Sequence, residues 1–246
     1  MDLSLAGKRA LVGGSSQGIG QAAAVALAEL GAEIVLIARN EIALKEVKSL
    51  LSVGHGQFHS YIIADFAQPA QVQKAIKDFI DAGHSIDILV NNTGGPPGGP
   101  AASAKIEDFN NAFSQHLICN HILAQAVLPG MKVNGFGRII NVISTSVKQP
   151  LPNLGVSNTV RAAVANWAKT LANELGRYGI TVNNVLPGAT GTGRLQSIIS
   201  GKSDKTGQSV DHVEKDMLRD IPAGRFGRPE EIANAIAFLA SPAAAY

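Results

Sequence analysis

The chain has 246 residues, of which 46% are hydrophobic and 16% are charged, and its formal net charge is +2. This charge is too small to indicate binding to nucleic acid or to an anionic membrane, and no apolar run approaches the roughly 18 residues that a membrane span needs. The single cysteine, Cys119, excludes an internal disulfide and is typical of a reducing compartment. We therefore expect a cytoplasmic protein with one domain over residues 1–246.

Short segments rich in Val and Ile alternate with longer segments of helical periodicity. Strands are predicted at 9–13, 33–38, 58–64, 86–91, 137–143 and 180–186, and helices at 18–30, 41–53, 69–82, 106–131, 154–178 and 229–240. The strands lack polar alternation, which is typical of strands buried on both faces. This order predicts an α/β fold with a Rossmann-type doubly wound parallel sheet in three α/β/α layers. Residues 188–222 are predicted to be a long irregular segment that acts as a substrate-side lid.

A glycine-rich turn joins the first predicted strand to the first helix. It contains Gly14, Ser15, Ser16, Gln17, Gly18, Ile19 and Gly20, in a G-x-x-x-G-x-G spacing. Glycines at these positions let the backbone approach a pyrophosphate, which then lies at the helix N-terminus. The turn predicts a dinucleotide site, and the alternative is a tight turn without a ligand.

Two residues at the ends of later strands concern the adenosine half of a dinucleotide. The second strand ends at Ala38 and Arg39, where a carboxylate would favour NAD; Arg39 can pair instead with a 2′-phosphate and favours NADP(H) over NAD(H). A solvated surface arginine is the alternative. Asp65, after the third strand, is a candidate for an adenine contact or for a turn cap.

Further motifs follow in order along the chain. They are Asn91-Asn92-Thr93-Gly94, Asn183, Pro187-Gly188 and Gly224-Arg225-Phe226-Gly227-Arg228-Pro229-Glu230-Glu231. With the glycine turn they resemble the short-chain dehydrogenase/reductase family over essentially the whole chain, and the 3-oxoacyl-acyl-carrier-protein reductases in particular. The resemblance implies a nicotinamide cofactor beside Asn92, Gly94, Pro187, Gly188 and Thr192. It also implies a homotetramer or homodimer, although the family's last strand is expected to be missing after residue 246.

The family's catalytic residues are mostly replaced. Its serine falls on Ser144, its tyrosine on Ser157, its lysine on Arg161 and its helix asparagine on His116. The chain resembles a divergent, reductase-like subgroup with Ser-Asn-x-x-Arg in place of Tyr-x-x-x-Lys. Asn120, one helical turn beyond His116, could restore an asparagine in a shifted register.

These replacements change the proton chemistry that the resemblance implies. A serine is a far weaker acid than a tyrosine, and Arg161 keeps the positive charge and the ribose contact but cannot relay a proton. His116 is the ordinary proton donor at these positions, and a His116–Ser157–Ser144 group could serve a carbonyl. The alternative for His116 is a bond to a backbone carbonyl. Arg161 could also hold an anionic substrate.

Other candidate residues are assigned structural roles. Cys119 is predicted to be a buried hydrophobe, and the six histidines have no metal-ligand spacing, so no metal site is expected. Residues 92–100, rich in Gly and Pro, are predicted to form a stiff rim over the nicotinamide end or a simple connector.

Three functions remain open. The first is an NADP(H)-dependent oxidoreductase that acts on a carbonyl or alcohol of unknown identity with a non-standard proton donor. The second is a catalytically silent dinucleotide-binding protein that acts as a sensor or as a subunit of a mixed oligomer. The third is isomerisation or hydration with His116 as base.

Overall fold

The computed structural model describes residues 1–246 and contains one parallel sheet of six strands in the order β3-β2-β1-β4-β5-β6. The strands are β1 (Arg9–Gly13), β2 (Glu33–Ala38), β3 (Ser60–Ile63), β4 (Ile88–Asn91), β5 (Gly137–Val142) and β6 (Ile180–Val185). The predicted doubly wound parallel sheet is confirmed. The strand order reverses between β1 and β4, and such a switch point opens a crevice at the carboxyl ends of the strands.

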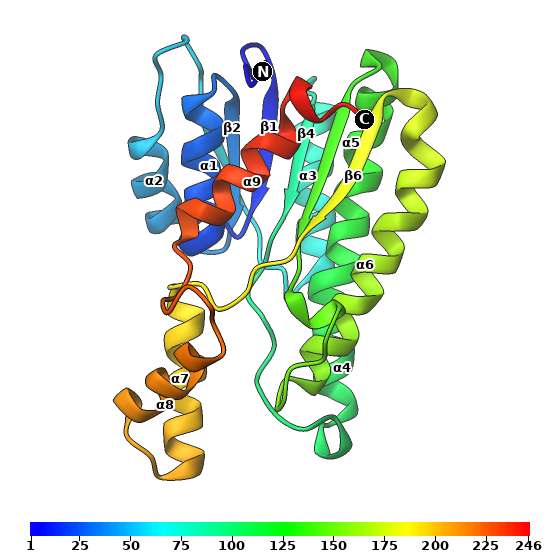
Figure 1. Cartoon of the computed structure of the whole chain (residues 1–246). Helices are drawn as coiled ribbons and strands as arrows, with labels where there is room; N and C mark the ends of the chain where they lie inside the picture. The colour runs from blue at the N-terminus through cyan, green and yellow to red at the C-terminus, as the bar shows by residue number, and fades with distance from the viewer.

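Helices cover both faces of the sheet (Figure 1). They are α1 (Gly18–Glu29), α2 (Glu41–Leu50), α3 (Pro69–Asp81), α4 (Ile106–Phe113), α5 (Cys119–Asn134), α6 (Gly155–Leu175), α7 (Gly193–Thr206), α8 (Val210–Arg219) and α9 (Pro229–Ala240). The helices α1, α2 and α9 pack on one face, and α3, α5 and α6 pack on the other. None of the helices is long and apolar enough to cross a membrane.

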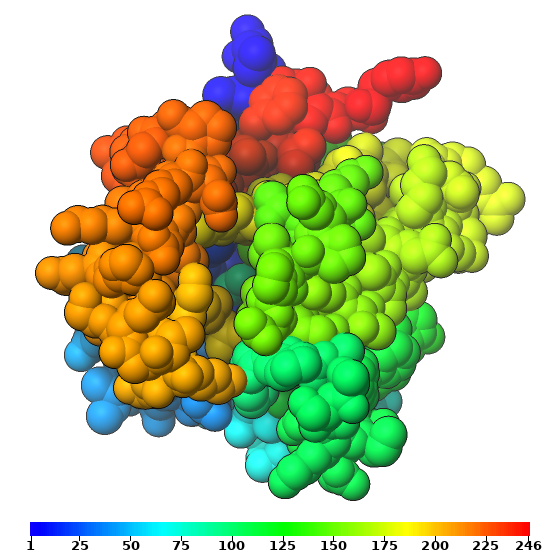
Figure 2. Space-filling model, turned by 60° about the horizontal axis from the view of Figure 1, so that its bottom comes forward, coloured from blue at the N-terminus to red at the C-terminus, as the bar shows by residue number.

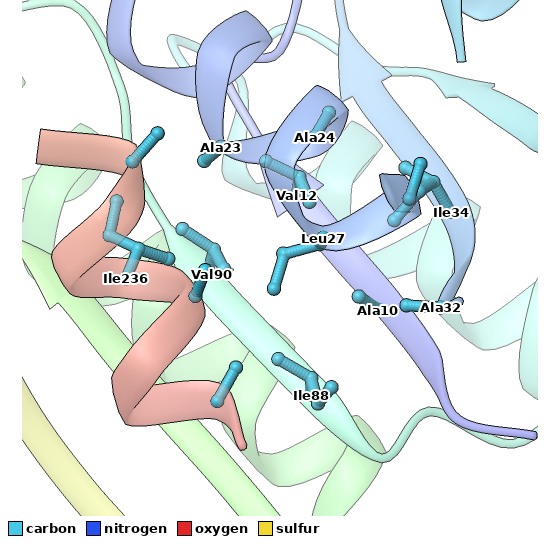
Figure 3. Packing of buried hydrophobic residues seen from close by; sticks show 14 of the residues in the cluster. Ala10, Val12, Ala23, Ala24, Leu27, Ala32, Ile34, Ile88, Val90 and Ile236 are labelled. Atoms are coloured by element: carbon cyan, nitrogen blue, oxygen red, sulfur yellow. The ribbon is translucent and has the colours of Figure 1, made fainter. Parts of the chain in front are cut away.

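Two hydrophobic clusters explain why the strands are apolar without alternation. Val12 packs with Leu27 of α1, Val90 of β4 and Ile236 of α9 (Figure 3), whereas Leu11 packs on the opposite face of the sheet. These side chains are completely buried. Burying a residue of this size contributes about 1.5 to 3 kcal/mol, so both faces of each strand stabilise the sheet.

Residues 188–222 differ from the prediction of an irregular segment, which was wrong. They contain α7, whose first turn is capped by the Thr192 side chain, and α8, whose first turn is capped by Ser209. Leu195, Ile199 and Val213 form a small separate cluster between the two helices. The pair projects beyond the carboxyl ends of the strands (Figure 1).

The helix predicted at 106–131 is interrupted. Residues Ser114–Ile118 form a π-helical turn between α4 and α5, and this turn contains His116. A π turn inserts an extra residue into the helix and changes which side chains share a face. The third strand is also shorter than predicted, because Phe58 is exposed and lies outside the sheet.

Candidate active site

A cleft of about 320 Å³ lies at the carboxyl ends of the strands. The glycine turn forms one wall, and residues 92–95, 142–145 and the start of α6 form the opposite side. Residues 187–190 and 192–195, with Ile198 and Met217, close it from the side of α7 and α8. Figure 2 shows this hollow between α7 and α8 and the segment around residues 140–160. The polypeptide therefore brings segments separated by 200 residues of sequence into one site.

The glycine turn packs so closely on Asn92 that side chains are excluded. A Cβ atom on Gly20 would lie 2.3 Å from the Gly14 carbonyl oxygen and 2.7 Å from Asn92 Nδ2. Asn92 Nδ2 in turn donates to the Gly13 carbonyl at 3.1 Å. Gly14 and Gly18 have φ angles of +55° and +59°, which favour glycine. At these positions the turn therefore exposes backbone groups, without side chains, to the cleft.

The start of α1 supplies unpaired backbone donors to the same place. Gln17 is the N-cap residue, but its side chain makes no capping bond, and the first turn of α1 has no acidic residue. The first N–H groups of a helix carry a partial positive charge and bind phosphate groups well. Turn and helix together fit the diphosphate of a dinucleotide.

Most predicted cofactor residues line the cleft, and five do not. Those in the lining are Gly14, Gln17, Gly18, Ile19, Asn92, Gly94, Arg161, Pro187, Gly188 and Thr192; those outside it are Ser15, Ser16, Gly20, Arg39 and Asp65. Ser15 has a structural task, because its buried Oγ accepts the Ile37 N–H at 3.0 Å and ties the turn to β2.

Arg39 and Asp65 follow β2 and β3 at the adenosine side of the expected dinucleotide. Arg39 is exposed and makes no ion pair, and Glu41, the nearest carboxylate after β2, is bonded to the Tyr61 hydroxyl at 3.0 Å. The end of β2 therefore presents a free cation. Asp65 Oδ1 accepts the Ala67 N–H at 2.9 Å, so this residue does cap a turn, and its other carboxylate oxygen is not used there.

Three of the four predicted catalytic residues meet in the cleft. Ser144 follows β5, and its Oγ accepts the Ser146 N–H at 3.1 Å, which leaves the hydroxyl hydrogen free to donate. Ser157 lies in the first turn of α6, one turn before Arg161. Arg161 Nη1 donates to the Val142 carbonyl at 2.9 Å. The cleft thus offers two hydroxyl donors and a guanidinium to one small space.

The fourth predicted residue, His116, lies behind this group. It is 2% exposed in the π turn, which packs against α6, and its Nε2 has no hydrogen-bond partner. Burial, with the nearby charges of Arg161 and Arg194, holds the pKa of His116 well below its ordinary value. His116 is therefore neutral at neutral pH. Asn120, one turn further, is also buried with an unpartnered Oδ1.

Arg194 is a cleft residue that sequence reasoning missed. Its Nη2 donates to the Pro96 carbonyl at 2.5 Å, and its guanidinium packs against Gly95. It lies in the first turn of α7, two residues after Thr192. The signal was present, because threonine is a preferred helix N-cap residue, and a helix that starts at Thr192 has Arg194 in its first turn. The irregular prediction for residues 188–222 concealed it.

The Gly- and Pro-rich segment 92–100 is fixed at both sides of the cleft. The Gly99 N–H donates to the Asn153 carbonyl at 2.7 Å, and the Gly155 N–H donates to the Gly99 carbonyl at 3.0 Å. A Cβ on Gly155 would lie 2.4 Å from the Ala101 nitrogen. Together with the hydrogen bond from Arg194 to Pro96, these contacts fix the position of segment 92–100 at the rim of the cleft.

A ladder of amides beneath the cleft was also missed. Asn91 Nδ2 donates to Asn141 Oδ1 at 2.9 Å, and Asn141 Nδ2 donates to Asn184 Oδ1 at 3.1 Å. The three residues are paired in register on β4, β5 and β6. Buried amides that bond each other fix the relative position of neighbouring strands. Asparagines in three apolar strands were the available signal.

Cys119 has the predicted structural role. It is completely buried, its thiol donates to the Phe66 carbonyl, and burial raises the pKa of this thiol to about 11. A thiol with such a pKa is not a nucleophile at neutral pH.

Comparison with known proteins places these features in a family. The family described as Enoyl-(Acyl carrier protein) reductase matches residues 14–246. The chain is 36% identical to 3-oxoacyl-acyl-carrier-protein reductase FabG of Vibrio cholerae, over 99% of this chain and 94% of that protein. It is 33% identical to 7alpha-hydroxysteroid dehydrogenase of Escherichia coli, over 100% and 91%.

A solved structure gives the same result. L-sorbose reductase from Gluconobacter frateurii, complexed with NADPH and L-sorbose, superposes with a TM-score of 0.91. It is 32% identical to this chain, and the match covers 100% of this chain and 94% of that one. These relatives are oxidoreductases by name.

Proposed function

We propose that this chain, which belongs to the short-chain dehydrogenase/reductase family, is an NADP(H)-dependent oxidoreductase that interconverts a carbonyl group and an alcohol. One observation carries the proposal. The glycine cradle and the group Ser144, Ser157 and Arg161 face the same cleft. A cofactor bound at the first would lie beside a carbonyl held by the second.

Different residues would bind the diphosphate, the 2′-phosphate and the nicotinamide of the cofactor. The backbone of Gly14 and Gly18 and the first N–H groups of α1 would bind the diphosphate, and Arg39 would pair with the 2′-phosphate of NADP. By the family resemblance, Pro187, Gly188 and Thr192 would lie at the nicotinamide. A bound NADP(H) supplies or accepts the hydride. The NADPH in the L-sorbose reductase structure supports this choice of cofactor.

The catalytic group stabilises a negative oxygen. The hydroxyls of Ser144 and Ser157 donate hydrogen bonds to the carbonyl oxygen, and these bonds strengthen as it becomes an alkoxide. Arg161, whose pKa burial lowers to about 10, remains charged at neutral pH and opposes the developing negative charge. Removing one such preorganised donor typically slows a reaction by about 10² to 10³.

The alkoxide takes its proton from water in the open cleft, and the hydroxide that remains is neutralised by exchange with the bulk solvent. Neither serine is acidic enough to supply it, Arg161 retains its proton, and His116 is neutral and outside the lining of the cleft. His116 supports the wall behind Arg161. In the same proposal, α7 and α8 form the substrate-side lid, because Leu195, Ile198 and Met217 line the cleft with apolar surface. The replacement of the family's tyrosine, lysine and asparagine would also fit a catalytically silent protein, but Ser144 in the lining of the cleft favours the oxidoreductase.

The test is turnover of NADPH with a panel of ketones and enones. We expect slow but measurable oxidation of NADPH with at least one compound, and a rate lower by about 10² in Ser144→Ala. Oxidation no faster than in buffer for every compound would refute the proposal, and so would full activity in Ser144→Ala.

A further inference from the structure

The cleft contains two arginines and no carboxylate. Arg161 and Arg194 are the charged residues in its lining, which has neither Asp nor Glu. Neither arginine takes part in an ion pair. Each guanidinium carries five N–H groups, and each makes one bond, to the backbone carbonyls of Val142 and Pro96 respectively. Most of the donors in this cleft therefore have no protein acceptor.

Two such cations are costly without an anion. Partly buried charges are normally paired, because water solvates them poorly in a cleft. Burial and the charge of Arg194 both lower the pKa of Arg161, so the two guanidinium groups repel each other electrostatically. An anion between them would remove this repulsion and occupy the free N–H groups.

The position of Arg194 decides which anion this is. The cofactor diphosphate has its own donors at the glycine turn and the start of α1. The Arg194 guanidinium packs against Gly95 and donates to the Pro96 carbonyl at the rim of the cleft. Arg194 is followed along α7 by the apolar Leu195 and Ile198, which also line the cleft. A ligand bound at Arg194 would therefore contact both its positive charge and the neighbouring apolar side chains.

We infer that the substrate is a carbonyl compound with a carboxylate group, which Arg194 binds while the carbonyl oxygen faces Ser144, Ser157 and Arg161. The inference rests on the proposed function for the reaction, and it adds the chemical class of the substrate. Arg194 is then a specificity-determining residue. The apolar lining from α7 and α8 would accommodate the carbon chain of the acid.

The experiment compares ketones that differ only in charge. The probes are 4-oxopentanoate and 2-oxopentanoate, each with its methyl ester, which place the carboxylate at two distances from the carbonyl. Their kcat/KM with NADPH and their calorimetric binding are measured in wild type and Arg194→Met. Arg177→Met is the control, since Arg177 is exposed at the C-terminal end of α6, at the opposite end from Ser157, and removes the same charge.

We expect the wild type to prefer at least one acid over its ester by about tenfold or more, as for a charge-assisted bidentate bond. Arg194→Met should abolish this preference and should weaken binding of the acid more than binding of NADPH, and Arg177→Met should keep the preference. Equal preference for acids and esters in the wild type would overturn the inference. A loss of NADPH affinity in Arg194→Met as large as the loss of acid affinity would do the same, since Arg194 would then serve the cofactor.

Binding and turnover separate this inference from the proposed function. Binding of an acid through Arg194 without NADPH oxidation would sustain the carboxylate site and refute the reductase. Turnover of acids and esters at equal rates would sustain the reductase and refute the carboxylate site.

Discussion

Gly20→Ala tests whether the glycine turn is shaped for a cofactor. The added Cβ would lie 2.3 Å from the Gly14 carbonyl oxygen and 2.7 Å from Asn92 Nδ2, well inside van der Waals contact. Neither atom can retreat alone, because Gly14 belongs to the turn and Asn92 is bonded to Gly13. Overpacking of this kind costs about 1 to 3 kcal/mol, and a helical Gly→Ala change recovers about 0.5 to 1 kcal/mol. The net loss of stability should therefore be up to about 2.5 kcal/mol.

The same strain should appear in cofactor affinity. The free protein can relieve the clash by opening the turn, but the bound state needs the turn closed. Closing the turn in the variant brings the strain back, and each 1.4 kcal/mol of this strain weakens the affinity for NADPH about tenfold. Urea unfolding measures the first effect, and fluorescence titration with NADPH measures the second.

Gly201→Ala is the matched control for this variant. Gly201 lies within α7, and a Cβ there would meet nothing within 4 Å, so stability and NADPH affinity should not fall. If Gly20→Ala bound NADPH as tightly as the wild type, the turn would not be the cofactor cradle that we describe.

Two further predictions concern charge. Arg39→Ala should weaken NADPH binding by about tenfold or more and leave NADH binding unchanged, as seen by calorimetry; an equal loss for both dinucleotides would show that Arg39 does not read the 2′-phosphate. The pKa of His116 is lower in the folded than in the unfolded state, so the unfolded chain binds more protons than the folded one below about pH 6.5. The free energy of unfolding therefore decreases as the pH is lowered, by up to about 1.4 kcal/mol per pH unit. Urea unfolding at pH 7.5 and 5.5 should therefore show a smaller loss on acidification in His116→Gln than in the wild type, and equal losses would mean that His116 is not buried neutral.

Much of the fold could be predicted from sequence, because the residues that decide it act locally. The strands from β1 to β6 are buried on both faces, which gives runs of Val and Ile that no helix period matches. The glycine turn was predictable because spacing and position each pointed to a strand–helix junction. The first and last helices begin at Gly18 and Pro229, as predicted.

The parts that were missed depend on contacts between distant residues. The helices α7 and α8 are mostly polar, and their stability comes from two caps and a three-residue apolar cluster that only forms when both helices are present. His116 could not be placed because the π turn alters the register of the helix locally. Arg194 reaches the cleft through a bond to Pro96, 98 residues away in sequence.

The most direct test of the account is a single turnover in Arg161→Gln. Protein loaded with NADPH is mixed with the most reactive carbonyl compound of the panel, and loss of the reduced-nicotinamide absorbance is followed in wild type, His116→Gln and Arg161→Gln. We expect oxidation in wild type and His116→Gln, and a rate lower by about 10² to 10³ in Arg161→Gln at saturating NADPH. An unchanged rate in Arg161→Gln, or a loss in His116→Gln as large as that in Arg161→Gln, would contradict the claim that the Arg161 guanidinium, and not His116, stabilises the negative charge that develops on the carbonyl oxygen.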